Sequence, residues 1–343
     1  MKLKIKEAEL ISNKILGNLG FYKEIAELTT KNLIEAELCG KKAHGLQKLL
    51  TIKKVLETKQ PKILDYLDYI DLELPNFSII SESISHIYIN GNYKPGFYLL
   101  YKSLELSFRK IRKSKLVVVG IKDVGFASGF IGAYARECAS RDLIFIGFNN
   151  SSGGLVPHGA KKDPWGTNPI TAGIPTHNLP IIIDTALSKI TWNDLLSFRR
   201  KGLSLPIDSA LDADGNPTTD PHKGGVGGLL PIGGRKGSAL AFMVELLAGA
   251  LTGSRCGCNV KGGWGSFYIL FDPTLFRSLK EFKTDVQIAI DELKTLPRAE
   301  GVKELFYPGE QSGKLRKKHL EQGWFEFDDS LWHDLHLLLP TER

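Results

Sequence analysis

The sequence predicts an α/β (α+β) fold, and two patterns carry that prediction. In the first 75 residues, apolar side chains recur at three- and four-residue spacing, the period of an amphipathic helix. From about Leu116 onward, short β-branched runs alternate with turns that contain Gly, Pro, Asn or Asp, as expected of strands. A chain of 343 residues is long enough for two domains, or for one large domain with a sizeable core.

The first part of the chain predicts two helices. Apolar residues follow the helical period over residues 5–16, and a second periodic segment covers residues 22–38. Gly40 comes soon after the second segment, where glycine commonly ends a helix. After Pro61 the pattern fades into a polar and aromatic stretch, which predicts a boundary between this helical unit and the rest of the chain.

The remaining part predicts strands mixed with helices. Strands are expected at 116–121, 143–148, 169–175, 180–184 and 266–271. A helix is expected at 129–142, between the first two strands, and another at 279–293. Residues 237–253 are apolar almost all round, which predicts a buried helix.

Composition and charge restrict the function classes. With 42% hydrophobic and 24% charged residues, and no apolar run near the roughly 18–20 residues that span a bilayer, we expect no membrane segment. The first residues alternate charged and apolar groups, unlike a signal peptide, so we expect a cytoplasmic location. The net charge of +7 raises nucleic acid as a partner. The basic residues are scattered, however, and favour instead an enzyme with an anionic substrate and a phosphorylated cofactor.

Several familiar motifs are incomplete. Cys256 and Cys258 form a lone CxC, so we expect reduced thiols and no metal. The glycines in residues 125–132 are spaced G-x3-G-x2-G, which excludes the Rossmann fingerprint G-x-G-x-x-G. A glycine stands where a P-loop would need its lysine in GLLPIGGRKGS. Residues 212–220 lack the closing glutamate of a calcium loop and predict a hydrogen-bonded turn.

Five stretches together resemble the type-2 malate/L-lactate dehydrogenases in order and spacing. They are HGLQK (44–48), NNSSGGLVPHGAKKDPWGTNP (149–169), IPT with PIIIDTALS (174–188), LDADGNPTTDP (211–221) and LLPIGGRKGSALAFMVELLAGALTG (229–253). The resemblance covers most of the chain, and the combination is far more specific than any one motif. The family consists of NAD(P)-dependent oxidoreductases and includes sulfolactate and ureidoglycolate dehydrogenases, diketogulonate reductase and piperideine-2-carboxylate reductase.

The resemblance implies a helical domain packed on a non-Rossmann cofactor domain with a mixed, mostly antiparallel sheet. Residues 1–75 would form the helical domain, completed by residues 279–343, and residues 76–278 would bind the cofactor. The active site would lie between the domains. A homodimer, NADPH or NADH as cofactor, and a small anionic or zwitterionic substrate are implied as well.

Three residues acquire catalytic or substrate-binding roles through the resemblance. His44 matches the general acid/base, a task that suits histidine near neutral pH. Asp184 matches an acid that holds the imidazole in one tautomer. Lys48 follows His44 by one helical turn and stands where the family usually has arginine, so it supplies charge for a substrate carboxylate without a bidentate fork. The alternatives are a surface histidine, a strand-end turn residue and a solvated lysine.

Glycine-rich turns are the expected cofactor contacts. The residues are Asn150, Ser151, Gly166, Thr167, Asn168, Gly233, Gly234, Arg235, Lys236 and Gly237. Backbone amides at a turn that opens a helix suit a phosphate, and Lys236 adds charge. The glycines could equally serve tight turns alone. Arg235 indicates a 2′-phosphate, but the sequence does not choose between the two nicotinamide cofactors.

The chain also departs from the family at five positions. Ala127 stands in place of a second histidine, Asn193 of a glycine, Asp194 of a lysine, His158 of a tryptophan and Arg235 of a histidine. With Asp194 as a substrate contact, loss of a cation should weaken the binding of dianions such as malate. A monoanionic, amine-bearing or cyclic-imine substrate would fit better.

The leading hypothesis is therefore an NAD(P)H-dependent reductase of a small 2-oxo acid, or of the C=N bond of a cyclic imine carboxylate. The competing hypothesis is a non-catalytic homologue that keeps the fold and acts as a binding or assembly protein. Nucleic-acid binding rests on the net charge alone.

Overall fold

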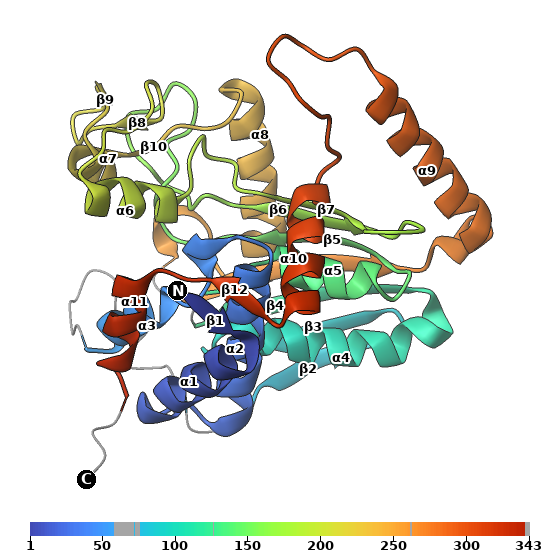
Figure 1. The fold of residues 1–343 in the computed structure, drawn as a ribbon. Coiled ribbons are helices and arrows are strands. Elements are labelled where there is room, and N and C mark those ends of the chain that lie inside the picture. The colour runs from blue at the N-terminus through green and yellow to red at the C-terminus, as the bar shows by residue number, and fades with distance from the viewer. Residues whose placement is uncertain (58–71, 73–75, 126, 261–262, 340–343) are drawn as a thin grey trace.

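A seven-stranded sheet forms the centre of the molecule (Figure 1). The computed structural model describes residues 1–57, 72, 76–125, 127–260 and 263–339. In spatial order the strands are β2 (Ser78–Glu82), β3 (His86–Asn90), β4 (Leu116–Val124), β11 (Trp264–Phe271), β5 (Ile144–Asn149), β6 (Ile170–Ile174) and β7 (Ile181–Thr185). Within this sheet only β3 and β4 pair in parallel, so the expected mixed, mostly antiparallel sheet is confirmed.

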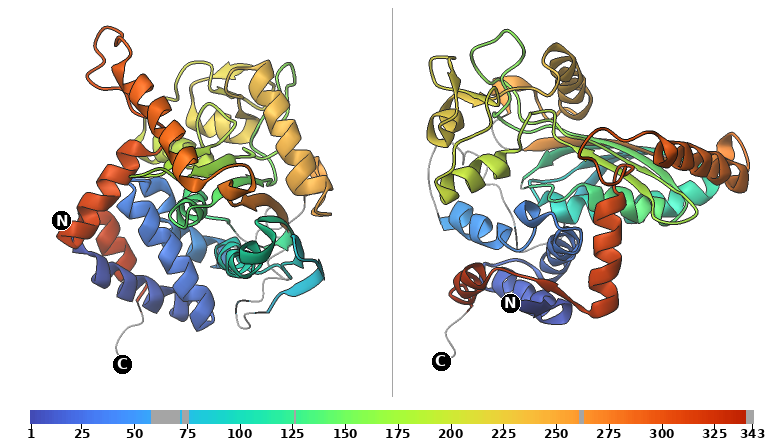
Figure 2. Two further views of the ribbon diagram at one scale, coloured as in Figure 1. Left: turned by 90° about the vertical axis from the view of Figure 1, so that its right-hand side faces the viewer. Right: turned by 45° about the horizontal axis from the view of Figure 1, so that its top comes forward.

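Successive residues of the central strands face two different cores. On β11, Tyr268 belongs to the main hydrophobic cluster, whereas its neighbour Phe267 packs on a second cluster. Helices α4 (Gly96–Ser114) and α5 (Gly132–Ala139) pack on the first side. The helical turn η3 (Glu245–Ala250) packs on the second (Figure 2). The central strands are thus covered on both faces, whereas the edge strand β2 is exposed.

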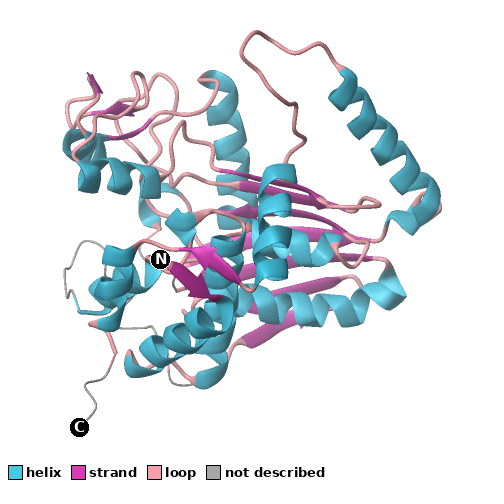
Figure 3. Ribbon diagram, viewed as in Figure 1, coloured by secondary structure: helices cyan, strands magenta, loops and turns pink. Residues whose placement is uncertain are grey.

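Both ends of the chain meet in one group of helices beside the sheet. It contains α1 (Ile5–Asn18), α2 (Lys23–Leu38), α3 (Lys48–Glu57), α10 (Glu310–Gln322) and α11 (Asp329–His336). The short strand β1 (Lys2–Lys4) pairs with β12 (Trp324–Glu326) and joins the two ends (Figure 3). One apolar cluster runs from this group into the sheet. The domain boundary at residue 75 stays a prediction.

A small lobe lies above the helix group and carries the helix that reaches the site. Its strands are β8 (Ala210–Leu211), β9 (Pro217–Thr218) and β10 (Gly228–Leu229), and its helices are α6 (Trp192–Lys201) and α7 (Pro221–Gly227). Leu195 of α6 is fully buried against Leu205 and Leu229. Packing of this apolar cluster holds α6 against the turn η1 (Lys42–His44).

The helix expected to be buried at 237–253 has one exposed side, so that expectation is wrong. It forms as α8 (Arg235–Val244), followed by the π-helical turn η3. Ala241, Val244 and Ala248 face the sheet and are buried. The exposed fractions of Leu240, Met243, Leu246 and Leu251 are 41%, 37%, 43% and 62%. The helix covers one face of the sheet, and no described residue covers its outer side.

Other expectations hold to varying degrees. The five expected strands are present, whereas the helix expected at 129–142 is only the eight-residue α5. Helix α4 and strands β2 and β3 were not predicted, and the region after Pro61 falls largely outside the described residues. The helix expected at 279–293 is α9 (Leu279–Thr295), which stands away from the body (Figure 2). Two 3₁₀ turns, η4 (Gly257–Asn259) and η5 (Pro273–Leu275), complete the elements.

Candidate active site

His44 lies at the end of a short turn that is anchored to α2. The turn η1 ends at His44, and Gly45 follows with a backbone conformation that breaks the helix. A Cβ at Gly45 would lie 2.1 Å from Glu37 Oε1, so a larger residue there would have to displace the Glu37 side chain. The same Glu37 oxygen accepts a hydrogen bond from Leu46 N at 2.8 Å. Glycine in the HG motif therefore leaves room for a buried carboxylate that holds the next residue.

Lys48 approaches His44 by a different route from the one expected. The sequence placed both on one helix, but η1 ends at His44 and α3 begins at Lys48, so that expectation is wrong. The two side chains meet instead through Asn193 of α6. Lys48 Nζ donates to Asn193 Oδ1 at 2.8 Å, and Asn193 Nδ2 lies 3.4 Å from His44 Nε2.

The surroundings of His44 favour its neutral form. Burial and the ammonium group of Lys48 lower the pKa of His44 to about 4, against a smaller opposing effect of Asp194. Burial also lowers the pKa of Lys48 to about 8. At neutral pH the site therefore contains a neutral imidazole beside a charged ammonium.

Asp184 lies at the end of β7 but forms no hydrogen bond to His44, although both residues are described. Its Oδ2 accepts from Gly132 N at 2.8 Å, at the start of α5. Burial raises the pKa of Asp184 to about 6, and the ammonium of Lys41 opposes this rise. Lys41 also acts on His44, so it lies within electrostatic range of both predicted catalytic groups. It borders an open hollow of about 440 Å³ together with Tyr307 and Ser312.

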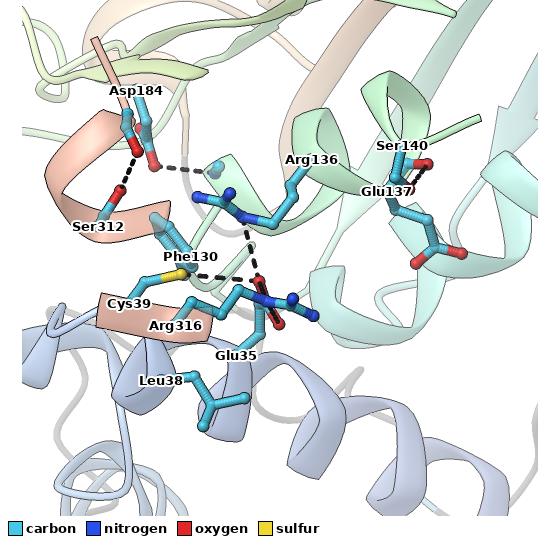
Figure 4. A network of polar contacts seen from close by, with 12 residues as sticks. Glu35, Leu38, Cys39, Phe130, Arg136, Glu137, Ser140, Asp184, Ser312 and Arg316 are labelled. Carbon is cyan, nitrogen blue, oxygen red and sulfur yellow. Dashed lines mark hydrogen bonds and ion pairs between the residues drawn. The ribbon is translucent and has the colours of Figure 1, made fainter. Parts of the chain in front are cut away.

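A buried ion cluster holds the helices around Asp184 in place (Figure 4). Glu35 of α2 accepts hydrogen bonds from Arg316 Nε of α10 through both carboxylate oxygens, Oε1 at 2.7 Å and Oε2 at 2.8 Å. Its Oε1 also lies 3.2 Å from Arg136 Nε of α5. The thiol of Cys39 also points at this carboxylate. One acidic group thus joins three helices from distant parts of the chain.

The carboxylate of Asp194 caps the start of its own helix, α6. Its Oδ2 accepts from Thr191 N at 2.9 Å and from Thr191 Oγ1 at 2.7 Å, which completes a capping box at the start of α6. The carboxylate still lies close enough to favour protonation of His44. In this structure the acid that acts on His44 is Asp194, whereas Asp184 holds α5.

The predicted cofactor segments lie side by side. Gly166 N donates to Ser151 O, Leu187 N to Thr167 O, and Ile232 N to Leu187 O, each at 2.9 Å. These backbone hydrogen bonds join the turns around 150, 166, 187 and 232 to one another. Residues 184–193 connect these turns to His44 and Lys48 through α6.

A buried glutamate that the sequence analysis missed holds two of these turns. Glu245 is 1% exposed and accepts from Asn168 Nδ2 at 2.7 Å, from Gly257 N at 2.7 Å and from Asn150 Nδ2 at 3.3 Å. The side-chain amides of Asn150 and Asn168 are thus turned toward Glu245. The signal was present, because Glu245 is the one charged residue in the apolar run SALAFMVELLAGALTG.

The start of α8 has the features of a phosphate site. Its N-cap is Gly234, which has no side chain to satisfy the first N–H groups of the helix. Gly237 is required by packing, since a Cβ there would lie 1.9 Å from Ile232 O. Arg235 and Lys236 are exposed at this end, and His158 lies against Gly234. These residues fit a phosphorylated dinucleotide.

The structure also bears on the expectations for Ala127, the Asp212 loop, the cysteines and a membrane segment. Ala127 packs against the main apolar core. The loop at Asp212 is the expected hydrogen-bonded turn, since Asp212 Oδ1 accepts from Asp214 N and Asn216 N. Cys256 and Cys258 are free thiols, and the described residues contain no cluster that could hold a metal. None of the described helices is long and apolar enough to cross a membrane.

Replacing Glu37 by glutamine should stabilise the protein at alkaline pH. Burial raises the pKa of Glu37 from 4.5 to about 7, so the folded state binds more protons than the unfolded state between these values. The free energy of unfolding therefore falls by up to about 3 kcal/mol as pH rises through that window. The free energy of unfolding of the glutamine variant does not fall in this pH range, and its side-chain oxygen can still accept the hydrogen bond from Leu46 N. Urea unfolding should show the variant about 2 kcal/mol more stable than wild type at pH ~8 and no gain at pH ~4.

Glu27→Gln is the matched control, because Glu27 is exposed on the same helix. A Glu37→Gln variant whose stability relative to wild type is the same at both pH values would contradict this interpretation.

Comparison with known proteins identifies the class. The chain is 32% identical over 93% of its length to the malate/(S)-sulfolactate dehydrogenase of Methanothermus fervidus, covering 91% of that protein. It is 29% identical over 80% of its length to the (2R)-3-sulfolactate dehydrogenase (NADP(+)) of Chromohalobacter salexigens, covering 82% of it. The solved structure of sulfolactate dehydrogenase from Methanocaldococcus jannaschii superposes with a TM-score of 0.84 at 29% identity, over 98% of this chain and 96% of that one.

Fold and relatives together define an NAD(P)-dependent oxidoreductase that uses NADH or NADPH. The model of the family described as malate/L-lactate dehydrogenase matches residues 3–336. The chain belongs to this family, as the five sequence motifs predicted. Its relatives are dehydrogenases of small acids.

Proposed function

We propose that the protein interconverts a small 2-hydroxy acid and its 2-oxo acid, with His44 as the general acid/base. The observation that supports this most strongly is the pairing of a neutral imidazole with the ammonium of Lys48 through Asn193. In the oxidative direction a neutral imidazole can accept the hydroxyl proton of the substrate, and in the reductive direction the imidazolium returns it. The bound nicotinamide supplies or accepts the hydride.

Lys48 is the proposed anchor for the substrate carboxylate. It is half-buried, so its charge acts strongly on an anion that enters the site. A carboxylate bound there also offsets the main charge that lowers the pKa of His44. Substrate binding would therefore bring the imidazole nearer to the pKa range in which acid/base catalysis is efficient.

Asp184 is proposed as a second catalytic candidate. Support comes from its buried carboxyl, the raised pKa of this group and its shared neighbour Lys41. In the described structure its carboxylate accepts a hydrogen bond from Gly132 N and positions α5.

An oxo acid is favoured over a cyclic imine as substrate. The imine alternative relied on Asp194 as a free anion in the substrate pocket. Its carboxylate is used by Thr191 in the capping box, which removes the reason for preferring an amine-bearing substrate. The non-catalytic alternative is not favoured, because the relatives are dehydrogenases and the chain keeps His44 and, in Lys48, a cation at the position of the family's usual arginine.

The start of α8 is the proposed phosphate anchor of the cofactor. The exposed Arg235 and Lys236 add positive charge at this helix start, whose N-cap has no side chain, and this charge favours the extra phosphate of NADPH. The cofactor turns at Thr167 and Gly166 continue from it. Asn150 and Asn168 would hold these turns in place through the hydrogen bonds of their side-chain amides to Glu245.

Cofactor titration followed by a substrate screen tests the proposal. Quenching of protein fluorescence should report saturable binding of NADPH, and more weakly of NADH. Oxidation of the reduced cofactor should then follow addition of a 2-oxo acid such as pyruvate, oxaloacetate or sulfopyruvate, and exceed that with piperideine-2-carboxylate. Binding of neither cofactor would contradict the proposal, and so would turnover with the imine alone.

A homodimer in the cytoplasm is part of the same proposal. The exposed leucines of α8 and η3 form an apolar side that a second copy could cover. Sedimentation velocity should give twice the chain mass of 38.0 kDa, and Leu246→Asp should shift it toward the monomer. The four free thiols support a reducing compartment.

A further inference from the structure

The side chain of Asn193 can adopt only one orientation between Lys48 and His44. An ammonium group only donates hydrogen bonds, so the atom that faces Lys48 Nζ at 2.8 Å must be Asn193 Oδ1. The amide nitrogen therefore faces His44 Nε2, at 3.4 Å. Because an amide nitrogen only donates, His44 Nε2 must be the acceptor. The neutral imidazole then carries its proton on Nδ1.

Helix α6 sets the position of Asn193 beside His44 and Lys48. Asn193 is the second residue of α6, which is fixed at its start by the Thr191–Asp194 capping box. Further along α6, Arg200 Nη2 donates to Gln47 Oε1 at 3.3 Å and ties the helix to the segment between His44 and Lys48. The amide of Asn193 is thus held across the gap between α6 and the His44–Lys48 segment. None of the predicted roles used this residue.

We propose that Asn193 is a positioning residue that couples carboxylate binding at Lys48 to the protonation state of His44. Without substrate, Asn193 bridges the two side chains and holds His44 as the Nδ1–H tautomer. An arriving carboxylate competes with Asn193 Oδ1 for the ammonium of Lys48. Once the ammonium turns to the carboxylate, the amide loses its anchor and His44 Nε2 becomes free to exchange a proton with the substrate.

The charges that face His44 determine the direction of this effect. Lys48 and Lys41 disfavour the imidazolium, and Asp194 favours it. A carboxylate at Lys48 adds a negative charge to this set, so binding makes His44 more basic. The tautomer is a property of the free protein, whereas the coupling rests on the proposed function.

Nitrogen NMR of the histidine rings tests the first part without any turnover. The protein has eight histidines, and the His44 signals are those missing from His44→Ala. In wild type, Nε2 should show the shift of a nonprotonated ring nitrogen. In Asn193→Ala the ring should become a mixture of tautomers. In Asn193→Asp the added carboxylate should raise the pKa of His44 by at least about one unit. The same tautomer and the same titration in all three proteins would overturn the proposal.

Oxamate, a non-reacting carboxylate, tests the coupling. In wild type, oxamate should raise the pKa of His44 and change the neutral ring from the Nδ1–H tautomer to a mixture of tautomers. In Lys48→Ala, oxamate should cause neither change. With a turned-over substrate, Asn193→Ala should lower KM several-fold, because the competing amide is gone, and lower kcat about tenfold. Leu196→Ala, on an exposed position of the same helix, is the matched control.

The two hypotheses fail in different ways. If no 2-oxo acid is turned over while the tautomer is as described, the proposed function is wrong and the role of Asn193 in the free protein stands. If turnover occurs but Asn193→Ala raises KM and lowers kcat together, with an unchanged tautomer, Asn193 has only a structural role and the further inference is wrong.

Discussion

Replacing His44 by alanine should lower kcat about 10²–10⁴-fold and leave the binding of reduced cofactor unchanged. His44 is the proposed proton-transfer group once a carboxylate bound at Lys48 has raised its pKa from about 4, and it lies on a turn separate from the predicted cofactor turns. Steady-state turnover with the preferred 2-oxo acid, combined with fluorescence titration of the cofactor, measures the two effects separately. His333→Ala is the control, since His333 is exposed on α11.

Two outcomes would contradict this prediction. Retention of wild-type turnover in His44→Ala would exclude the residue as the proton-transfer group. Loss of cofactor binding in parallel with activity would show that His44 supports the cofactor turns instead.

Replacing Glu245 by alanine should reduce the free energy of unfolding by about 3–5 kcal/mol and weaken cofactor binding. The carboxylate accepts from three donors, Asn168 Nδ2, Asn150 Nδ2 and Gly257 N. A buried donor left without a partner costs about 1–3 kcal/mol. Two of the donors belong to turns that we propose bind the cofactor, so relaxation of these turns should weaken that binding. Urea unfolding measures the loss of stability.

Glu245→Gln should show an intermediate loss, because its amide keeps one acceptor oxygen and turns a donor toward the remaining groups. Glu292→Ala, at an exposed position of α9, is the control. A change of less than about 1 kcal/mol in Glu245→Ala would show that water or other groups satisfy the three donors equally well.

Local sequence signals predicted much of the fold. The apolar runs at 116–121 and 266–271 form the central strands β4 and β11, because alternate side chains of both strands face the main apolar core. The apolar run at 237–253 was read as buried on all sides. Hydropathy does not say whether a second surface lies over a helix, and the structure leaves Leu246 and Leu251 exposed.

The site was predictable in its segments but not in its contacts. The motifs identified turns that the structure places side by side, although Asn150 and Asn168 face Glu245. Residues 191–194 have the Thr-x-x-Asp spacing of a capping box. The role of Asp194 in capping α6 could therefore have been predicted from the sequence. The bridge from Lys48 through Asn193 to His44 joins residues about 150 positions apart, and no local pattern reports such a contact.

Transfer of a label from cofactor to product tests the central claim most directly. Wild-type protein, NADPH with deuterium at both C4 positions and a 2-oxo acid should give a 2-hydroxy acid with deuterium on carbon 2, detected by mass spectrometry. His44→Ala should bind the same cofactor and transfer the label at least about 100-fold more slowly. An unlabelled product, or equal transfer rates in the two proteins, would contradict the account of this site.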